Sequence, residues 1–180
     1  MSQDEVDVLR AAIIMTSSGL DAGLKRLVND VGRHLIGKPA TGARAAYQEY
    51  LKRELSKPST STGMRNAITD MDPTRKLLDL HLADRTRASL QGSGELRVRV
   101  REVLGIPAAY VPDERLASLD DFFVARNRIA HDMDYTSASA HSVKRHHRNP
   151  ETAAAMCSNA FDVAVALISG AAMVLKRVGV

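Results

Sequence analysis

The chain is poor in cysteine and in aromatic residues. It has one cysteine, Cys157, no tryptophan, and an aromatic fraction of 4% among 180 residues. A lone cysteine excludes an internal disulfide, so the sequence predicts a reducing compartment. With few aromatic rings, the core must be built mainly from aliphatic side chains, which favours helices. The hydrophobic share of 44% and the charged share of 26% exclude a disordered chain.

The sequence has no segment typical of a secretion signal or a membrane anchor. Its first ten residues, MSQDEVDVLR, carry acids where a signal peptide has a basic region and an apolar run. The most apolar stretch, AFDVAVALISGAAMVL, is interrupted by Asp162 and is short for a bilayer span. We therefore expect a soluble, cytoplasmic protein. The net charge of +4 and the pI of about 9.4 are compatible with a nucleic-acid partner without requiring one.

Apolar periodicity predicts a long first helix. Its apolar residues recur at steps of three, four and seven: Val6, Leu9, Ile13, Leu20, Leu24, Leu27, Val31 and Leu35. The small, polar stretch TSSGLDAG lies inside this helix, and Gly37 and Pro39 end it. A second helix is predicted over residues 41–55, and a third begins at Pro73 with Asp72 as its N-cap.

Two later segments need separate treatment. Residues 95–105, ELRVRVREVLG, alternate like a strand at Leu96, Val98 and Val100, but they also form a helical stripe. We predict a helix, because a lone strand would have nothing to pair with. The following segment, residues 106–115, is expected to be a turn region. SLDD, residues 118–121, resembles a capping box at the start of the next helix.

The last helix is predicted to begin at Pro150, with Asn149 as its cap, and to end near Arg177. It is apolar over most of its circumference, so it is either central to the core or shared with a second chain. Together these segments predict a single domain over residues 1–180. The expected fold is an all-α bundle of antiparallel neighbours with a long first and a long last helix.

An arginine stands in the middle of FFVARNRIAHDMDY, residues 122–135. Arg126 falls on the same helical line as four apolar residues: Leu119, Phe122, Ile129 and Met133. A guanidinium on a core-facing line is costly unless something pairs with it or requires it there. It is therefore either a salt-bridged structural arginine near a surface histidine, or part of a functional site with Asn127 and His131.

These residue types suit the cleavage of RNA. The 2′-hydroxyl of RNA is a nucleophile beside each scissile phosphate, so cleavage needs a base, an acid and positive charge on the phosphorane. An imidazole can act as either base or acid near neutral pH. Arginine offers a forked donor matched to phosphate. Asn127 lies four residues before His131, hence on the same face, where it can orient the imidazole or contact the substrate.

The spacing Arg-Asn-x-x-x-His in a late helix resembles the active-site motif of the HEPN superfamily (higher-eukaryote and prokaryote nucleotide-binding domains), many of which are metal-independent ribonucleases. The first helix, LRAAIIMTSSGLDAGLKRLVNDVGRHLI, and the approach LASLDDFFVARNRIAHDMDY are similar to the RiboL-PSP-HEPN subgroup. The likeness extends loosely over residues 5–178. The bare Arg-x4-His pattern is weak alone. RNAITD, residues 65–70, begins in the same way but ends in Asp70.

The resemblance implies an HEPN-like helical bundle that acts as a metal-independent endoribonuclease without a cofactor. Arg126 would bind phosphate, His131 would transfer protons, and Asn127 would position the imidazole or the substrate. Such enzymes are homodimers with a composite site. Five residues of regular helix turn the chain by about 140°, so one protomer does not bring Arg126 and His131 to one face. A toxin or phage-defence effector is implied, with an antitoxin or regulatory protein as a possible partner.

Two residues are candidates for supporting roles. Asp21, in the first helix, can hold Arg126 between turnovers or can be an ordinary solvated or capping carboxylate. Many HEPN toxins have a tyrosine two residues after the histidine, but here that position is Met133. Control by modification of that tyrosine is therefore in doubt. Tyr135 can stack on a base, although core packing is the more common use of such a residue.

The segment HSVKRHHRN is strongly basic. Lys144, Arg145, His146, His147 and Arg148 can bind the RNA backbone, in which case their contribution weakens with salt, or can form a plain solvated loop. Zinc is disfavoured, because adjacent histidines in a loop suit it poorly and no cysteine or acid joins them. Two other functions stay open. One is a non-catalytic HEPN module that binds RNA, a nucleotide or a partner protein, and the other is a structural dimer formed through the last helix.

Overall fold

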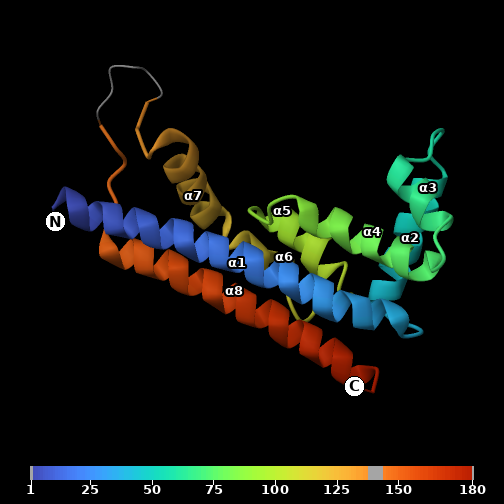
Figure 1. The fold of residues 1–180 in the computed structure, drawn as a ribbon. Coiled ribbons are helices and arrows are strands. Elements are labelled where there is room, and N and C mark those ends of the chain that lie inside the picture. Colours follow the sequence, from blue (N-terminus) through green and yellow to red (C-terminus); the bar gives the residue numbers. More distant parts are fainter. Residues whose placement is uncertain (1, 138–143, 180) are drawn as a thin grey trace.

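The computed structural model describes residues 2–137 and 144–179, and all regular secondary structure in these ranges is helical (Figure 1). This confirms the all-α prediction. The elements in chain order are α1 (Gln3–Gly37), α2 (Gly42–Leu55), α3 (Thr62–Ile68), α4 (Pro73–Arg87), α5 (Ser93–Leu96), the π-helical turn η1 (Arg97–Arg101), α6 (Asp113–Ala117), α7 (Asp120–Asp132) and α8 (Pro150–Arg177).

Helix α1 is the spine of the molecule. It packs against α8, α7, α2, α4 and η1, and it buries one residue per turn along a single stripe that includes Ile13, Leu24, Val28 and Leu35. Burying large aliphatic side chains contributes about 1.5–3 kcal/mol each, so this stripe supplies much of the driving force for folding. The polar stretch TSSGLDAG does not interrupt the helix.

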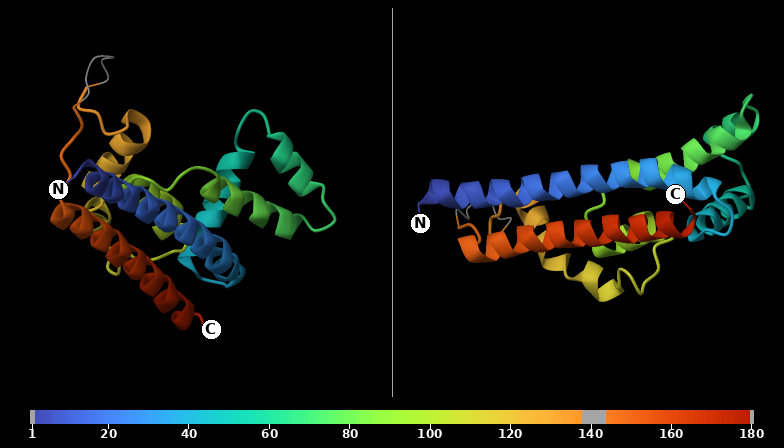
Figure 2. Two further views of the ribbon diagram at one scale, coloured as in Figure 1. Left: turned by 60° about the vertical axis from the view of Figure 1, so that its left-hand side comes forward. Right: turned by 90° about the horizontal axis from the view of Figure 1, so that it is seen from below.

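The two long helices run side by side in the same direction, as both views in Figure 2 show. The expected antiparallel arrangement is therefore wrong for this pair. The chain runs back along α1 through α4 and α7 before it starts α8 near the N-terminal end of α1 (Figure 1). Short loops favour antiparallel neighbours, but α1 and α8 are separated by more than a hundred residues, so no short loop restricts their direction.

Most predicted helix starts are confirmed. Asp72 accepts a hydrogen bond from the backbone N–H of Arg75, and Pro73 is the first residue of α4. Asn149 accepts one from the N–H of Thr152, and α8 runs from Pro150 to Arg177 as predicted. These caps satisfy N–H groups that have no partner within the helix.

Three local expectations need correction. Helix α3 was not predicted, because its first residues belong to SKPSTSTG, residues 56–63, which has the composition of a loop. Residues 95–101 are helical as predicted, with the π-turn η1 over Arg97–Arg101, but residues 102–105 form turns. SLDD is not a cap: Ser118 has helical dihedrals, and its hydroxyl donates to the carbonyl of Arg115. An N-cap needs extended backbone, so α7 begins after Leu119 without a side-chain cap.

Helix α8 is not short for a bilayer span, contrary to the expectation from its apolar stretch. The 28-residue helix is long and apolar enough to span a membrane by length and composition, and 33% of its most apolar window is buried inside the protein. Helix α8 packs against α1, and its buried face includes Val163, Leu167 and Ala171. Outside this buried stripe, Phe161, Val165 and Ile168 are 62%, 60% and 50% exposed. The helix is therefore part of the core on one side and open on the other.

Candidate functional site

Helix α7 carries the Arg-Asn-x-x-x-His motif. Its first turn is held in the core by Phe122 and Phe123, which are both buried. The apolar line that begins at Leu119 leaves the core along the helix, and Met133, at its far end, is 62% exposed. Arg126 lies where this line passes from core to solvent and is half-buried. The position explains how a charged residue is accommodated on an otherwise apolar line.

Arg126 is bonded to its neighbour in the motif. Its Nη1 donates to the side-chain oxygen of Asn127 at 3.0 Å. Its Nε is buried and has no hydrogen-bond partner. No carboxylate forms an ion pair with Arg126 in the described parts of the chain. The interpretation of Arg126 as a salt-bridged structural arginine is therefore wrong, and part of its donor capacity is unused.

His131 lies in the last turn of α7 and is exposed to solvent. The helix is continuous from Asp120 to Asp132, so it does not unwind before the histidine. Asn127 lies one turn before His131 on the same face, while Arg126 is rotated from it by about 140°. Arg126 is therefore bonded to Asn127, the motif residue that shares a helix face with His131.

Asp21 does not approach Arg126. One carboxylate oxygen of Asp21 accepts the backbone N–H of Leu90 at 2.7 Å, and the other pairs with the Lys25 ammonium at 2.7 Å. The predicted role of Asp21 in holding Arg126 is therefore wrong within this chain. Instead, Asp21 connects α1 to the segment after α4, because it accepts the backbone N–H of the buried Leu90.

Sequence reasoning missed a buried ion network beside the motif. Asp134 is fully buried, and its carboxylate accepts from Arg10 Nε at 2.9 Å and from Arg148 Nε and Nη2 at 2.9 and 2.6 Å. Burial alone would raise the pKa of Asp134, but hydrogen bonds from Arg148 and Arg10 outweigh it and hold the pKa below the usual aspartate value. The network joins α1, the bend after α7 and the segment just before α8.

The backbone after His131 is bent to reach this network. Met133 and Asp134 have φ of 50° and 62°, a left-handed conformation that costs free energy in residues other than glycine. The N–H of Asp134 donates to the carbonyl of Arg128 at 2.9 Å, and its carbonyl accepts from the N–H of His146 at 2.8 Å. These bonds fix the end of α7 and hence the position of His131.

The sequence did contain one signal for this network. Arg10 is 6% exposed and lies three residues before Ile13 on the buried stripe of α1. A guanidinium on a buried stripe needs a charged partner or a functional reason, as for Arg126 on α7. Its partner, Asp134, is 124 residues away, so no local spacing could have identified the pair.

The basic residues predicted to bind RNA gather around a pocket of about 630 Å³ near the start of α1. Lys144, Arg145, His146, His147 and Arg148 all contribute to its lining, together with Tyr135. The Arg145 guanidinium lies 5.1 Å from the centre of the Tyr135 ring, so one face of this ring already has a partner. His141, in the same basic segment, lies outside the described residues.

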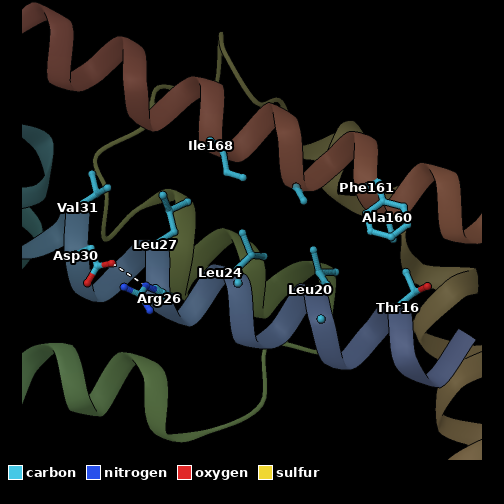
Figure 3. Close-up of a pocket in the computed structure, with 13 residues that line it drawn as sticks. Thr16, Leu20, Leu24, Arg26, Leu27, Asp30, Val31, Ala160, Phe161 and Ile168 are labelled. Atoms are coloured by element: carbon cyan, nitrogen blue, oxygen red, sulfur yellow. Dashed lines mark hydrogen bonds and ion pairs between the residues drawn. The ribbon is translucent and has the colours of Figure 1, made fainter. Parts of the chain in front are cut away.

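A second hollow is apolar and lies between α1 and α8 (Figure 3). This groove of about 350 Å³ is floored by Gly19 and Gly23 of α1 and walled by Phe161 and Ile168 of α8. Arg26 and Asp30 form an ion pair at 3.1 Å at one end. None of the motif residues lines it, so the groove is separate from the candidate site.

Comparison of the chain with protein-family models, with curated proteins and with solved structures finds no match. The candidate site consequently rests on the geometry of the motif and on the resemblance of its sequence to the HEPN pattern.

Proposed function

We propose that this protein is a cytoplasmic, metal-independent endoribonuclease of the HEPN type that acts as a homodimer and needs no cofactor. A toxin or phage-defence effector is the biological role that we assign to it, with an antitoxin or regulatory protein as a partner. The proposal rests on one observation. Arg126 has no carboxylate partner in the described chain, and it donates to Asn127, which lies on the same helix face as the exposed His131.

The chemistry follows from these residue types. His131 takes the proton from a 2′-hydroxyl, whose oxygen then attacks the adjacent phosphorus. Arg126 donates to the phosphorane oxygens as negative charge accumulates on them. The bond from phosphorus to the 5′-oxygen breaks, and a protonated imidazole supplies the proton that this oxygen needs. The products are a 2′,3′-cyclic phosphate and a 5′-hydroxyl, with no net consumption of water.

Two proton transfers on opposite sides of the phosphorus are best served by two histidines, which is why we propose a dimer. Helix α8 offers a surface for association. Phe161, Val165, Ile168 and Ala172 follow one another at steps of four, three and four, and all are exposed. This is the spacing of a coiled-coil seam, and a second copy of the chain would remove it from water.

A second function is favoured by one observation. Helix α7 is regular through His131, so a single protomer has Arg126 and His131 on different faces. A monomer would therefore bind phosphate through Arg126 without completing a catalytic pair. The alternative is a non-catalytic module that binds RNA, a nucleotide or a partner protein.

A cleavage assay separates the two functions. Purified wild type and His131→Ala are incubated with cellular RNA in the presence of EDTA, and the ends of the products are analysed. We expect cleavage by wild type only, with cyclic-phosphate ends, and a rate loss of about 10²- to 10⁴-fold in the variant. Equal cleavage by both proteins would refute the role of His131. Binding without cleavage by either would favour the non-catalytic module.

A further inference from the structure

The basic pocket at the start of α1 carries more positive than negative charge. Arg10, Lys144, Arg145 and Arg148 contribute four cations to its lining. Two carboxylates oppose them, Asp7 in the lining and Asp134 beneath it. Two positive charges are therefore left in excess, and the pocket favours an anionic ligand.

The excess charge lies on the solvent side of the pocket. Asp134 neutralises the inner guanidinium groups, because it pairs with both Arg10 and Arg148. Asp7 is shared between Arg10 at 2.8 Å and Arg145 at 3.2 Å. Lys144 is exposed and forms no ion pair within residues 2–137 and 144–179. Lys144 and the partly exposed Arg145 are consequently the cations available to a ligand.

Backbone bonds fix the chain that carries these two cations. The N–H of Thr136 donates to the carbonyl of Lys144 at 2.8 Å, and Tyr135 and Arg145 pair across an isolated β-bridge. The Arg145 guanidinium also rests on the Tyr135 ring. A site whose backbone is already ordered loses less conformational entropy on binding. The backbone of the pocket and the Arg145 guanidinium are thus ordered before a ligand binds.

The pocket lies close to the candidate catalytic residue. Tyr135 follows His131 by four residues, and four residues of extended chain span at most about 14 Å. An extended strand of nucleic acid that reaches His131 can therefore place a neighbouring phosphate in this pocket. A phosphodiester carries one negative charge, which suits a site with a small excess of positive charge.

We propose that this pocket binds a backbone phosphate of the same single-stranded RNA that the Arg126–His131 site cleaves. The inference rests on the proposed function, since it takes RNA as the ligand. It assigns Lys144 and Arg145 to substrate binding, whereas Arg10, Asp134 and Arg148 hold the pocket in shape. Asp7 opposes the ligand by its charge.

The test measures RNA binding in a His131→Ala background, so that cleavage does not interfere. A fluorescently labelled single-stranded oligoribonucleotide is titrated with protein at several salt concentrations. The test variant is Lys144→Gln with Arg145→Gln. The control is Lys52→Gln with Arg53→Gln, an adjacent lysine and arginine on α2 whose side chains are 73% and 56% exposed. Both variants lose the same net charge.

On single strands the salt slope is about −0.7 per phosphate that is neutralised. Because the pocket is assigned one phosphate, the pocket variant should lose about 0.7 from this slope and bind about 5-fold more weakly at about 0.1 M salt, while the control should lose far less. Asp7→Asn should bind more tightly than its parent, a gain that misfolding cannot produce. Equal effects of the two double variants would overturn the proposal, as would weaker binding by Asp7→Asn.

The outcome is distinguishable from a failure of the proposed function. If wild type does not cleave RNA in EDTA but the pocket variant alone loses binding, RNA binding by the pocket is supported and the nuclease function is refuted. If wild type cleaves RNA and both double variants bind RNA equally, the nuclease function is supported and RNA binding by the pocket is refuted.

Discussion

Arg10 and Asp134 are joined at 2.9 Å across 124 residues of sequence, and both side chains are buried. Arg148 binds the same carboxylate from the segment just before α8. The buried charge of Asp134 is therefore compensated from two sides. The contact also fixes the bend that follows His131, so a purely structural ion network lies directly beside the residues proposed for catalysis.

Asp134→Asn should destabilise the protein strongly. Removing one partner of a buried ion network typically costs about 3–5 kcal/mol, because the remaining charges lose their compensation. Urea denaturation of the variant and of wild type measures the difference in the free energy of unfolding. Asp30→Asn is the control, since it removes the exposed ion pair with Arg26 and should cost less than about 1 kcal/mol. Similar losses in both variants would contradict the prediction.

The pH dependence of this contribution has a defined sign. The pKa of Asp134 is lower in the folded than in the unfolded protein, so the unfolded state binds more protons in acid. The stabilisation is complete above the unfolded pKa of about 3.9 and is lost as pH falls through the folded pKa. Acid unfolding driven by Asp134 therefore begins only below about pH 4.

Protonation of His81 should destabilise the protein at a higher pH than protonation of Asp134 does. It is fully buried on α4, its ring lies 4.6 Å from that of Tyr50, and neither ring nitrogen has a hydrogen-bond partner. Burial, with the charges of Arg85 and Arg53, lowers the pKa of His81 from 6.5 to about 4. The unfolded state therefore binds the proton more readily, and stability falls as pH drops from about 6.5 toward 4.

The expected loss from His81 between pH 7 and pH 5 is about 2 kcal/mol. Thermal or urea unfolding across this range measures it. His81→Leu should abolish most of the dependence, because leucine has a similar volume and no titratable group. His34→Leu, which replaces an exposed histidine of α1, should leave the dependence in place. A wild type whose stability is constant from pH 7 to 5 would show that His81 is solvated or protonated in the native state.

Arg126 should not be replaceable by lysine. Lysine keeps the charge but lacks the forked donor that matches a phosphorane, and the loss of one stabilising donor typically slows the reaction about 10²- to 10³-fold. Both Arg126→Lys and Arg126→Ala should show this loss in the EDTA assay while they retain normal folding. Full activity of Arg126→Lys would reduce the role of Arg126 to general electrostatic attraction.

Mixing two inactive variants tests the composite site. Arg126→Ala and His131→Ala each lack every copy of one motif residue, but a mixed dimer retains one arginine and one histidine from different chains. If the two copies of the motif share one cleft, co-refolded variants should regain part of the wild-type rate. If each protomer works alone, the mixture should stay as inactive as its components.

The exposed seam of α8 should control association. Val165→Glu with Ile168→Glu places two charges on that seam and should convert a dimer into monomers in sedimentation equilibrium. Leu55→Glu, at a residue of α2 that is 55% exposed, should leave the oligomeric state unchanged. If wild type is monomeric at high concentration, or if the double variant stays dimeric, the seam is not the interface.

Local sequence signals predicted the helices well. Asp72 with Pro73 and Asn149 with Pro150 mark helix starts, because capping depends on groups within three or four residues of each other. The Arg-Asn-x-x-x-His motif lies on a late helix, as its sequence context predicted. SLDD misled for a related reason, since a hydroxyl at a helix end has several nearby acceptors and the backbone conformation decides among them.

The sequence by itself determined most of the helical segments, the apolar stripe of α1, and that Arg126, Asn127 and His131 belong to one helix. Only the tertiary structure decided that α1 and α8 run in the same direction, that Asp21 binds Leu90 and Lys25, and that Arg10, Asp134 and Arg148 form one network. Helix formation depends on interactions a few residues apart. Helix direction and buried ion pairs depend on which distant segments meet, and that is settled only when the whole core packs.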